Sequence, residues 1–107
     1  MKYVWAGALA LGLAGCSTVA LDQMNSGLAQ AIGQPVSQVE SALGTAAEIT
    51  RDGAQTKYRW FAESVIEPCQ VEVWADADGQ VRRTAWSGYA KACEEFASGL
   101  STVFPAQ

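Results

Sequence analysis

Three cysteines carry the most reactive side chains of this 107-residue chain, and their positions give them different expected roles. Cys16 follows an apolar run near the start, whereas Cys69 and Cys93 lie in the second half. The chain contains no histidine, so a histidine-assisted nucleophile and a histidine metal ligand are excluded. The chemistry to consider is therefore that of sulfur: acylation, disulfide formation or thiol exchange.

The segment before Cys16 has the order of a secretory signal. Lys2 gives a positive start, an uncharged apolar run extends from Val4 to Ala14, and small residues precede the cysteine. This run is shorter than the roughly 20 apolar residues that cross a bilayer core, so a permanent transmembrane helix is not expected. The alternatives to a lipoprotein signal are an ordinary signal peptide with an incidental cysteine, or a buried first helix.

The four residues Leu13-Ala14-Gly15-Cys16 resemble the bacterial lipobox. The resemblance implies cleavage between Gly15 and Cys16, a diacylglyceryl group on the sulfur, and a fatty acid such as palmitate on the new amino terminus. Several acyl chains anchor a protein stably, because each buried methylene contributes about 0.8 kcal/mol. An aspartate commonly keeps such lipoproteins at the inner membrane, and Ser17 stands in its place. The resemblance thus implies the periplasmic face of the outer membrane.

Cleavage at this site predicts a signal peptide over 1–15, a lipid-anchored tether over 16–20, one domain over 21–100 and a loose tail over 101–107. Loss of Lys2 leaves six of the seven basic residues against eleven acidic ones, so the net charge changes from −4 to −5. An acidic chain without a basic stripe is not expected to bind nucleic acid.

Cys69 and Cys93 remain as an even pair once Cys16 carries lipid. In an oxidising compartment such a pair predicts a disulfide, and closing a loop of about 24 residues adds about 3 kcal/mol of stability. The alternatives are two free thiols or a redox pair, but neither CxxC spacing nor a histidine favours redox chemistry. No metal is expected, and no cofactor other than the covalent lipid on Cys16.

Carboxylates are the other candidates for chemistry. The motif DADG, Asp76–Gly79, offers two calcium ligands, but residues 80–83 supply no further ligand and a hairpin turn explains the motif better. Two sets of glutamates are possible acid–base pairs: Glu63 with Glu67, and Glu94 with Glu95. A polar loop and a solvated helix face explain them equally well, and no nucleophile elbow is present, so no enzyme is expected.

Two helices are expected at the start of the mature chain. The segment ALDQMNSGLAQAIG has apolar residues at helical spacing and closes on Gly33. Its apolar stripe consists of Leu21, Met24, Leu28 and Ile32. The next segment, GQPVSQVESALG, predicts a shorter helix that begins at a capping box of Ser37 and Glu40 and ends at Gly44.

The pattern then changes to a period of two, which predicts strands separated by turns at Asp52-Gly53 and DADG. The expected strands cover residues 46–51, 56–61, 69–75 and 80–86, and a last helix covers 89–100. The sequence therefore predicts an α+β protein. It is a two-layer sandwich, with the N-terminal helices packed on a 3–4-stranded antiparallel sheet and a short C-terminal helix.

The order of these features resembles the SmpA/OmlA (BamE-like) domain of small outer-membrane lipoproteins. The segments that carry the resemblance are IGQPVSQVESALG, DGAQTKYRW, the cysteine-led strand, DADGQV, and a Trp-Ser-Gly followed by the second cysteine. The helix spacing of the family is matched by Gly33, Val39, Leu43 and Gly44. One departure is Ala46, where the family often has proline, and another is the cysteine pair. The resemblance implies a helical pair followed by an antiparallel sheet.

A partner surface is expected on the sheet face that points away from the helices. If the last three strands form a meander, Trp74 and Trp86 lie there among charged residues, with Glu72 between basic neighbours. The other charged members of this surface are Arg59 and Arg82. Tryptophan among charges is typical of protein-binding surfaces. The alternatives are that both tryptophans pack against the tail near Phe104, or that the register differs by one residue and they are core.

These features predict a non-catalytic scaffold, held at the periplasmic face of the outer membrane by its acyl anchor, which docks an envelope protein of unknown identity. The alternative is an inhibitor of a periplasmic or secreted hydrolase, because BamE-like folds resemble the repeats of a β-lactamase-inhibitory protein.

Overall fold

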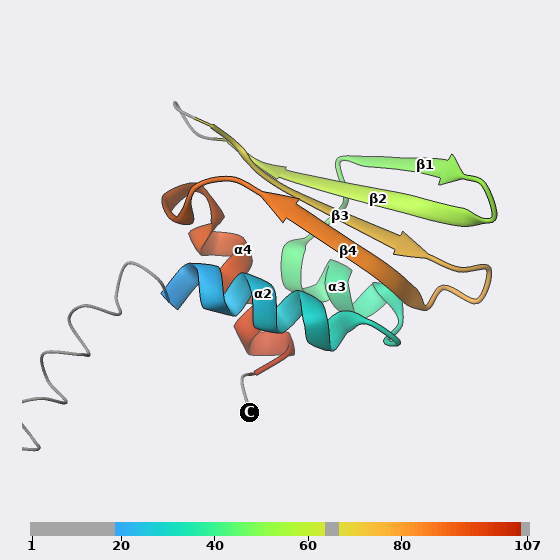
Figure 1. Ribbon diagram of the computed structural model, residues 1–107, viewed down its shortest axis with the longest axis horizontal. Coiled ribbons are helices and arrows are strands. Elements are labelled where there is room, and N and C mark those ends of the chain that lie inside the picture. Colours follow the sequence, from blue (N-terminus) through green and yellow to red (C-terminus); the bar gives the residue numbers. More distant parts are fainter. Residues whose placement is uncertain (1–18, 64–66, 106–107) are drawn as a thin grey trace, which may run out of the picture.

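Helices and sheet form two layers in the computed structural model, which describes residues 19–63 and 67–105 (Figure 1). The elements, in chain order, are α2 (Val19–Ala31), α3 (Val36–Leu43), β1 (Glu48–Asp52), β2 (Gln55–Ala62), β3 (Cys69–Ala75), β4 (Val81–Ser87) and α4 (Ala90–Val103). The predicted α+β class, with helices on an antiparallel sheet and a short C-terminal helix, is confirmed. The lipobox and its cleavage site lie outside the described residues.

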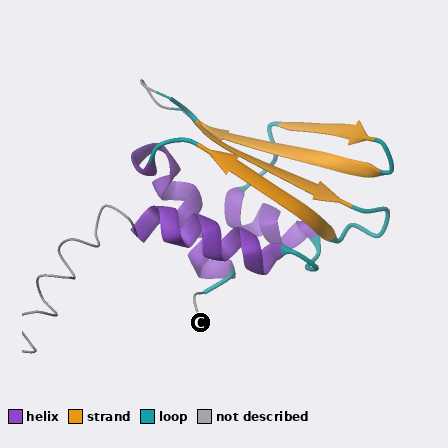
Figure 2. Cartoon of the chain, in the orientation of Figure 1, coloured by secondary structure: helices purple, strands orange, loops and turns teal. Residues whose placement is uncertain are grey.

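The four strands form an antiparallel meander in the order β1-β2-β3-β4 (Figure 2). Gly53 has a φ of 66° at the first position of the two-residue turn between β1 and β2, where a type II′ turn requires positive φ. The central strand β3 spans Cys69–Ala75, as predicted. Its buried alternate residues, which face the helices, are Cys69, Val71, Val73 and Ala75.

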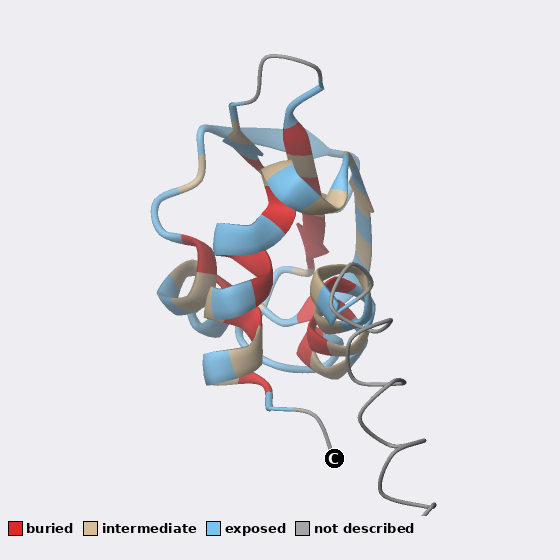
Figure 3. Cartoon of the chain, turned by 90° about the vertical axis from the view of Figure 1, so that its left-hand side faces the viewer, coloured by how far each residue is buried: buried red, intermediate tan, exposed pale blue. Residues whose placement is uncertain are grey.

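The core lies between the sheet and the helices, where the buried segments in Figure 3 gather. Trp60 of β2 is the largest fully buried side chain; its ring stacks on Tyr58 and its indole N–H donates to the Gly44 carbonyl over 2.8 Å. Gly44, with a φ of 88°, is also the C-cap of α3. One tryptophan therefore joins the sheet to the end of a helix.

A disulfide between Cys69 and Cys93 joins the first residue of β3 to the first turns of α4. This is the pairing predicted from the two cysteines that remain once Cys16 is assigned to the lipid. Both sulfurs are fully buried. Gly88 lies beside them with a φ of 137°, and a Cβ there would lie 2.8 Å from the Cys69 Cα. Glycine is therefore required where the chain turns from β4 into α4.

The end of α2 and the start of α3 differ from the prediction. α2 ends at Ala31, so Ile32 lies beyond the helix, is 49% exposed and does not belong to the core stripe. The predicted capping box is wrong, because Pro35 occupies the N-cap of α3 and Ser37 lies inside the helix. Proline takes this position readily, since it has no N–H to leave unpaired.

The predicted domain limits are also too narrow. α2 begins at Val19, inside the predicted tether, and α4 continues to Val103. Phe104 follows the helix and is buried, so the loose tail predicted from residue 101 is wrong for residues 101–104. Apolar contact with α2 holds this end, and the Phe104 carbonyl accepts a 3.4 Å hydrogen bond from Gln30. Within the described ranges, no helix has the length and apolar character to cross a membrane.

Candidate functional site: the outer face of the sheet

The three helices lie on one side of the sheet and leave its other side, here called the outer face, uncovered (Figure 1). Cross-strand pairing places alternate residues of all four strands on this face. These residues are Glu48, Thr50 and Asp52 of β1, Gln55, Lys57, Arg59 and Phe61 of β2, Gln70, Glu72 and Trp74 of β3, and Arg83, Ala85 and Ser87 of β4. Acidic and basic side chains are equal in number among them.

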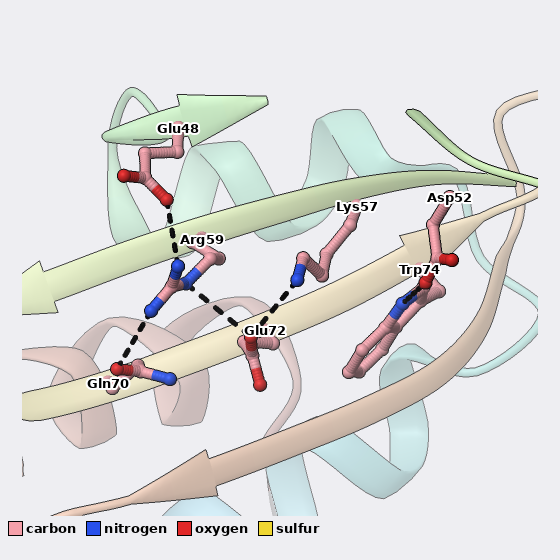
Figure 4. A network of polar contacts seen from close by, with 7 residues as sticks. All are labelled: Glu48, Asp52, Lys57, Arg59, Gln70, Glu72 and Trp74. Atoms are coloured by element: carbon pink, nitrogen blue, oxygen red, sulfur yellow. Dashed lines mark hydrogen bonds and ion pairs between the residues drawn. The ribbon is translucent and has the colours of Figure 1, made fainter. Parts of the chain in front are cut away.

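Arg59 is the centre of a row of charges that crosses three strands (Figure 4). Its guanidinium donates to Glu48 over 2.9 Å and to the Gln70 side-chain oxygen over 3.2 Å. Glu72 lies 3.4 Å from the Arg59 Nε and 3.6 Å from the Lys57 Nζ. Glu72 therefore contacts two basic residues, but both belong to β2; on the other neighbouring strand, β4, Ala85 lies opposite Glu72 where a basic residue was predicted.

The contact between Arg59 and Glu72 is an ion pair without a hydrogen bond, since the buried Nε lacks the alignment for one. All three side chains of the Lys57, Arg59 and Glu72 cluster are between 22% and 28% exposed. Ion pairs at such partly exposed positions contribute up to about 1 kcal/mol each to the free energy of unfolding, and less in high salt. Their main effect is to fix the directions of long side chains.

Trp74 lies on the outer face, as predicted, but it is buried, with only 7% of its surface exposed. Its indole N–H donates to the Asp52 carboxylate over 2.7 Å, across the intervening strand β2 (Figure 4). The Arg83 guanidinium covers the ring at 3.8 Å from its centroid, and the Lys57 Nζ lies at 6.0 Å. Charged neighbours therefore shield this tryptophan and hold it by cation–π attraction.

Trp86 faces the helices, so its predicted place on the outer face is wrong. It lies opposite Val71, packs against the core and donates its indole N–H to Asn25 of α2 over 3.0 Å. The cause is a β-bulge: Ala75 pairs with Val81 while Trp74 pairs with Arg83, which leaves Arg82 as an extra residue. One extra residue reverses the alternation of everything that follows it in the strand.

Arg82 is therefore separated from Glu72, and its predicted place among the outer-face charges is wrong. Its Nε instead donates to the Asp76 carboxylate over 2.7 Å, within the turn between β3 and β4. The other Asp76 oxygen accepts the backbone N–H groups of Asp78 and Gln80. The hairpin interpretation of DADG is confirmed, and the carboxylate proposed as a calcium ligand closes the turn.

These hydrogen bonds lower the pKa of Asp76 below its ordinary value of 3.8; the largest cause is the N–H of Gln80, followed by the Arg82 side chain. A depressed pKa adds stability above the ordinary value, and this stability is lost as the pH falls through the lowered value. We therefore expect Asp76→Asn to lower the melting temperature at pH 6, with the difference from wild type shrinking below the ordinary pKa and vanishing below the lowered one. Thermal unfolding by circular dichroism from pH 7 to 2 measures this.

Asp78→Asn is the matched control, because the Asp78 carboxylate makes no hydrogen bond or ion pair with the described residues. We expect its melting temperature to follow wild type across the series. A constant difference between Asp76→Asn and wild type at every pH would contradict the proposed role of the charge.

The other glutamates considered for acid–base chemistry are spread over the surface. Glu63 and Glu67 are exposed on either side of residues 64–66, which lie outside the description, and Glu94 and Glu95 are exposed on α4. Glu94 lies 3.9 Å from Lys91, an ordinary pair at helical spacing. In the part of the chain that the structure describes, no three metal-ligating side chains come together.

Two residues of the outer face were missed by sequence reasoning. Asp52 was assigned only to a turn, although an acidic residue beside a strand is a possible partner for an indole N–H. Arg83 was not assigned to the outer face, because nothing in QVRRTAW marks the bulge that places it there. Both are needed to explain how Trp74 is covered.

No family model, curated protein or solved structure matched the chain when it was compared with each set. What the outer face can do is therefore argued from its geometry. Its charged side chains are fixed either by ion pairs around Arg59 or by contact with Trp74. Among the described residues of this face, Phe61 alone is an exposed large hydrophobic side chain. Such a surface is suited to docking another protein.

Proposed function

We propose that this chain is a lipoprotein of the outer membrane, anchored through Cys16 on the periplasmic face, and that it docks an envelope protein on the outer face. The observation that carries the docking proposal is the charge row around Arg59, on a sheet face that no helix covers. Side chains already fixed in one geometry lose little further freedom on binding, so less of the binding energy is spent on ordering them.

The anchor is supported by the order of residues around Cys16, and the compartment by the Cys69–Cys93 disulfide, since disulfides persist in oxidising environments. The two-layer arrangement of helices on an antiparallel meander supports the proposed relation to SmpA/OmlA (BamE-like) domains. A role without catalysis is proposed with it. The runner-up, inhibition of a periplasmic or secreted hydrolase, would use the same outer face.

The anchor predicts a change of compartment when Cys16 is replaced. Cells that express the full chain should incorporate radiolabelled palmitate into it and retain it in the outer-membrane fraction. Cys16→Ala should abolish the label and remove at least about nine-tenths of the protein from that fraction, because a chain without acyl groups has no anchor.

Two neighbouring variants sharpen this test. Ser17→Ala should keep both label and location, and Ser17→Asp should keep the label but move the protein to the inner membrane. A wild-type chain found in the aqueous fraction with an unmodified Cys16 thiol would contradict the anchor.

The docking surface predicts face-specific crosslinking. Ala85 is exposed on the outer face beside Glu72, and Glu95 is exposed on the opposite layer, so a photo-crosslinking amino acid can replace either without entering the core. In intact cells, we expect the probe at Ala85 to capture one envelope protein and the probe at Glu95 to capture none. Capture of a periplasmic hydrolase at Ala85 would favour the inhibitor, and equal patterns at both positions would contradict docking on this face.

A further inference from the structure

β1 is an edge strand that has a neighbour on one side only. All five of its residues are exposed, including Ile49 and Arg51 on the side of the sheet that carries the helices. Ile49 faces that side, opposite Tyr58, and 56% of its surface is exposed, the largest fraction among the exposed large hydrophobic residues of the described chain. An exposed edge with an apolar side chain is a template for pairing with another strand.

The charged residues of β1 do not prevent pairing at this edge. Charged side chains often prevent edge pairing, but Glu48 is bound to Arg59 and Asp52 is bound to the Trp74 indole, both on the outer face of their own sheet (Figure 4). Among the described residues, Arg51 is the one charge of β1 without an ion pair or side-chain hydrogen bond. The edge is therefore less protected than its composition suggests.

We propose that β1 pairs with β1 of a second copy of this chain, antiparallel, with the two Ile49 residues opposite each other. This register places Glu48 opposite Thr50 and Arg51 opposite Ala47, so no like charges face each other. Moving the register by one pair in either direction fails. One shift places Glu48 opposite Asp52, a repulsive contact, and separates the two isoleucines. The other places the two Glu48 residues opposite each other, which is also repulsive, and Ile49 opposite Ala47.

The symmetry of this pairing suits a tethered protein. The two-fold axis runs perpendicular to the sheet, so both helix layers, and with them the first described residue of each chain, Val19, lie on the same side of a continuous eight-stranded sheet. Two anchors that leave the same side can enter one bilayer. The two outer faces then form one surface on the other side.

A membrane tether would also compensate for the small area of the contact between the two strands. Two edge strands of five residues bury far less than the roughly 1,200 Å² of a stable interface, so the pair is weak between freely diffusing copies. Confinement to one membrane raises the effective concentration of each copy for the other. In this respect the inference rests on the proposed lipid anchor.

A cysteine at position 49 tests the register. Opposite residues of antiparallel strands have Cα atoms about 4.5–5.5 Å apart, within the range that a disulfide bridges. Full-length Ile49→Cys is expressed in cells, and a mild oxidant is added before non-reducing electrophoresis. Arg51→Cys is the matched control, because it lies on the same strand and the same side but faces Ala47 of the other copy. We expect about tenfold more linked homodimer from Ile49→Cys than from Arg51→Cys.

A mixed experiment fixes the register independently of residue 49. Coexpressed Arg51→Cys and Ala47→Cys chains, carrying different tags, should form a linked heterodimer, whereas Arg51→Cys alone should not. No homodimer from Ile49→Cys, equal amounts from Ile49→Cys and Arg51→Cys, or linkage of the Ile49→Cys thiol to a different protein would each overturn the pairing. Fractionation of the same cells separates the two proposals: a chain absent from membranes contradicts the anchor, and an absent crosslink contradicts the pairing.

Discussion

Replacing Gly99 with alanine is expected to lower the free energy of unfolding by about 3 kcal/mol, although alanine is the better helix former. Gly99 lies in α4 where that helix meets α3, and a Cβ at this position would overlap the backbone carbonyl oxygen of Ala42. Because the obstacle is backbone and not the end of a flexible side chain, α3 and α4 have to move apart. That movement opens the core around Leu43 and Leu100.

Urea unfolding followed by circular dichroism measures this change. Ser98→Ala is the matched control, since Ser98 is the preceding residue of the same helix and is exposed; its stability should stay within about 0.5 kcal/mol of wild type. Gly27→Ala should also destabilise the protein, because its Cβ would lie 2.8 Å from the Leu100 Cβ, which moves only with α4; the loss should be smaller than for Gly99→Ala, whose Cβ would overlap a backbone oxygen. A Gly99→Ala variant as stable as Ser98→Ala would show that the helices do not approach so closely.

Removal of the disulfide is the second large effect. The double variant Cys69→Ala/Cys93→Ala is expected to lose about 3 kcal/mol, because the unfolded chain gains the freedom of the 24-residue loop that the bond closes. Replacing both cysteines leaves no unpaired thiol to exchange. For a domain this small, such a loss is a large part of the total stability.

Reduction of the wild-type protein provides the comparison for this variant. Unfolding of the wild type in the presence of dithiothreitol should reproduce the midpoint of the double variant, and the reductant should not change the double variant itself. If the double variant and the oxidised wild type unfolded at the same urea concentration, the bond would be dispensable for folding.

Elements whose sequence pattern lies within one short segment, such as β3 and α3, were predicted correctly as strand and helix. β3 was predicted with its bounds and its inner residues, because alternation runs without interruption from Cys69 to Ala75. The second helix was predicted as a helix because apolar spacing and two flanking glycines agree. The capping box failed although Ser37 and Glu40 have the required spacing, because the N-cap is Pro35, two residues before Ser37.

The candidate site was predicted only where it depends on regular pairing. Glu72 and Arg59 meet because both follow the simple alternation of β2 and β3. Trp86 was misplaced because a single extra residue, Arg82, reverses the later part of β4, and no residue type marks that bulge. Asp52 and Trp74 lie on β1 and β3, with β2 between them, so they are not direct cross-strand neighbours. Their hydrogen bond depends on the length and direction of the indole side chain, which strand pairing alone does not predict.

The packing of α2 against α4 has a consequence for biogenesis. α4 packs along α2, with Leu100 against Gly27, and Met24 and Leu28 of α2 share one core with Leu100 and Phe104. α2 therefore emerges before α3, the sheet and α4 during synthesis or export, and lacks its partner until Leu100 has followed. Folding in vectorial order has no stable halfway product, and a chain stopped short of Leu100 should be a substrate for proteases.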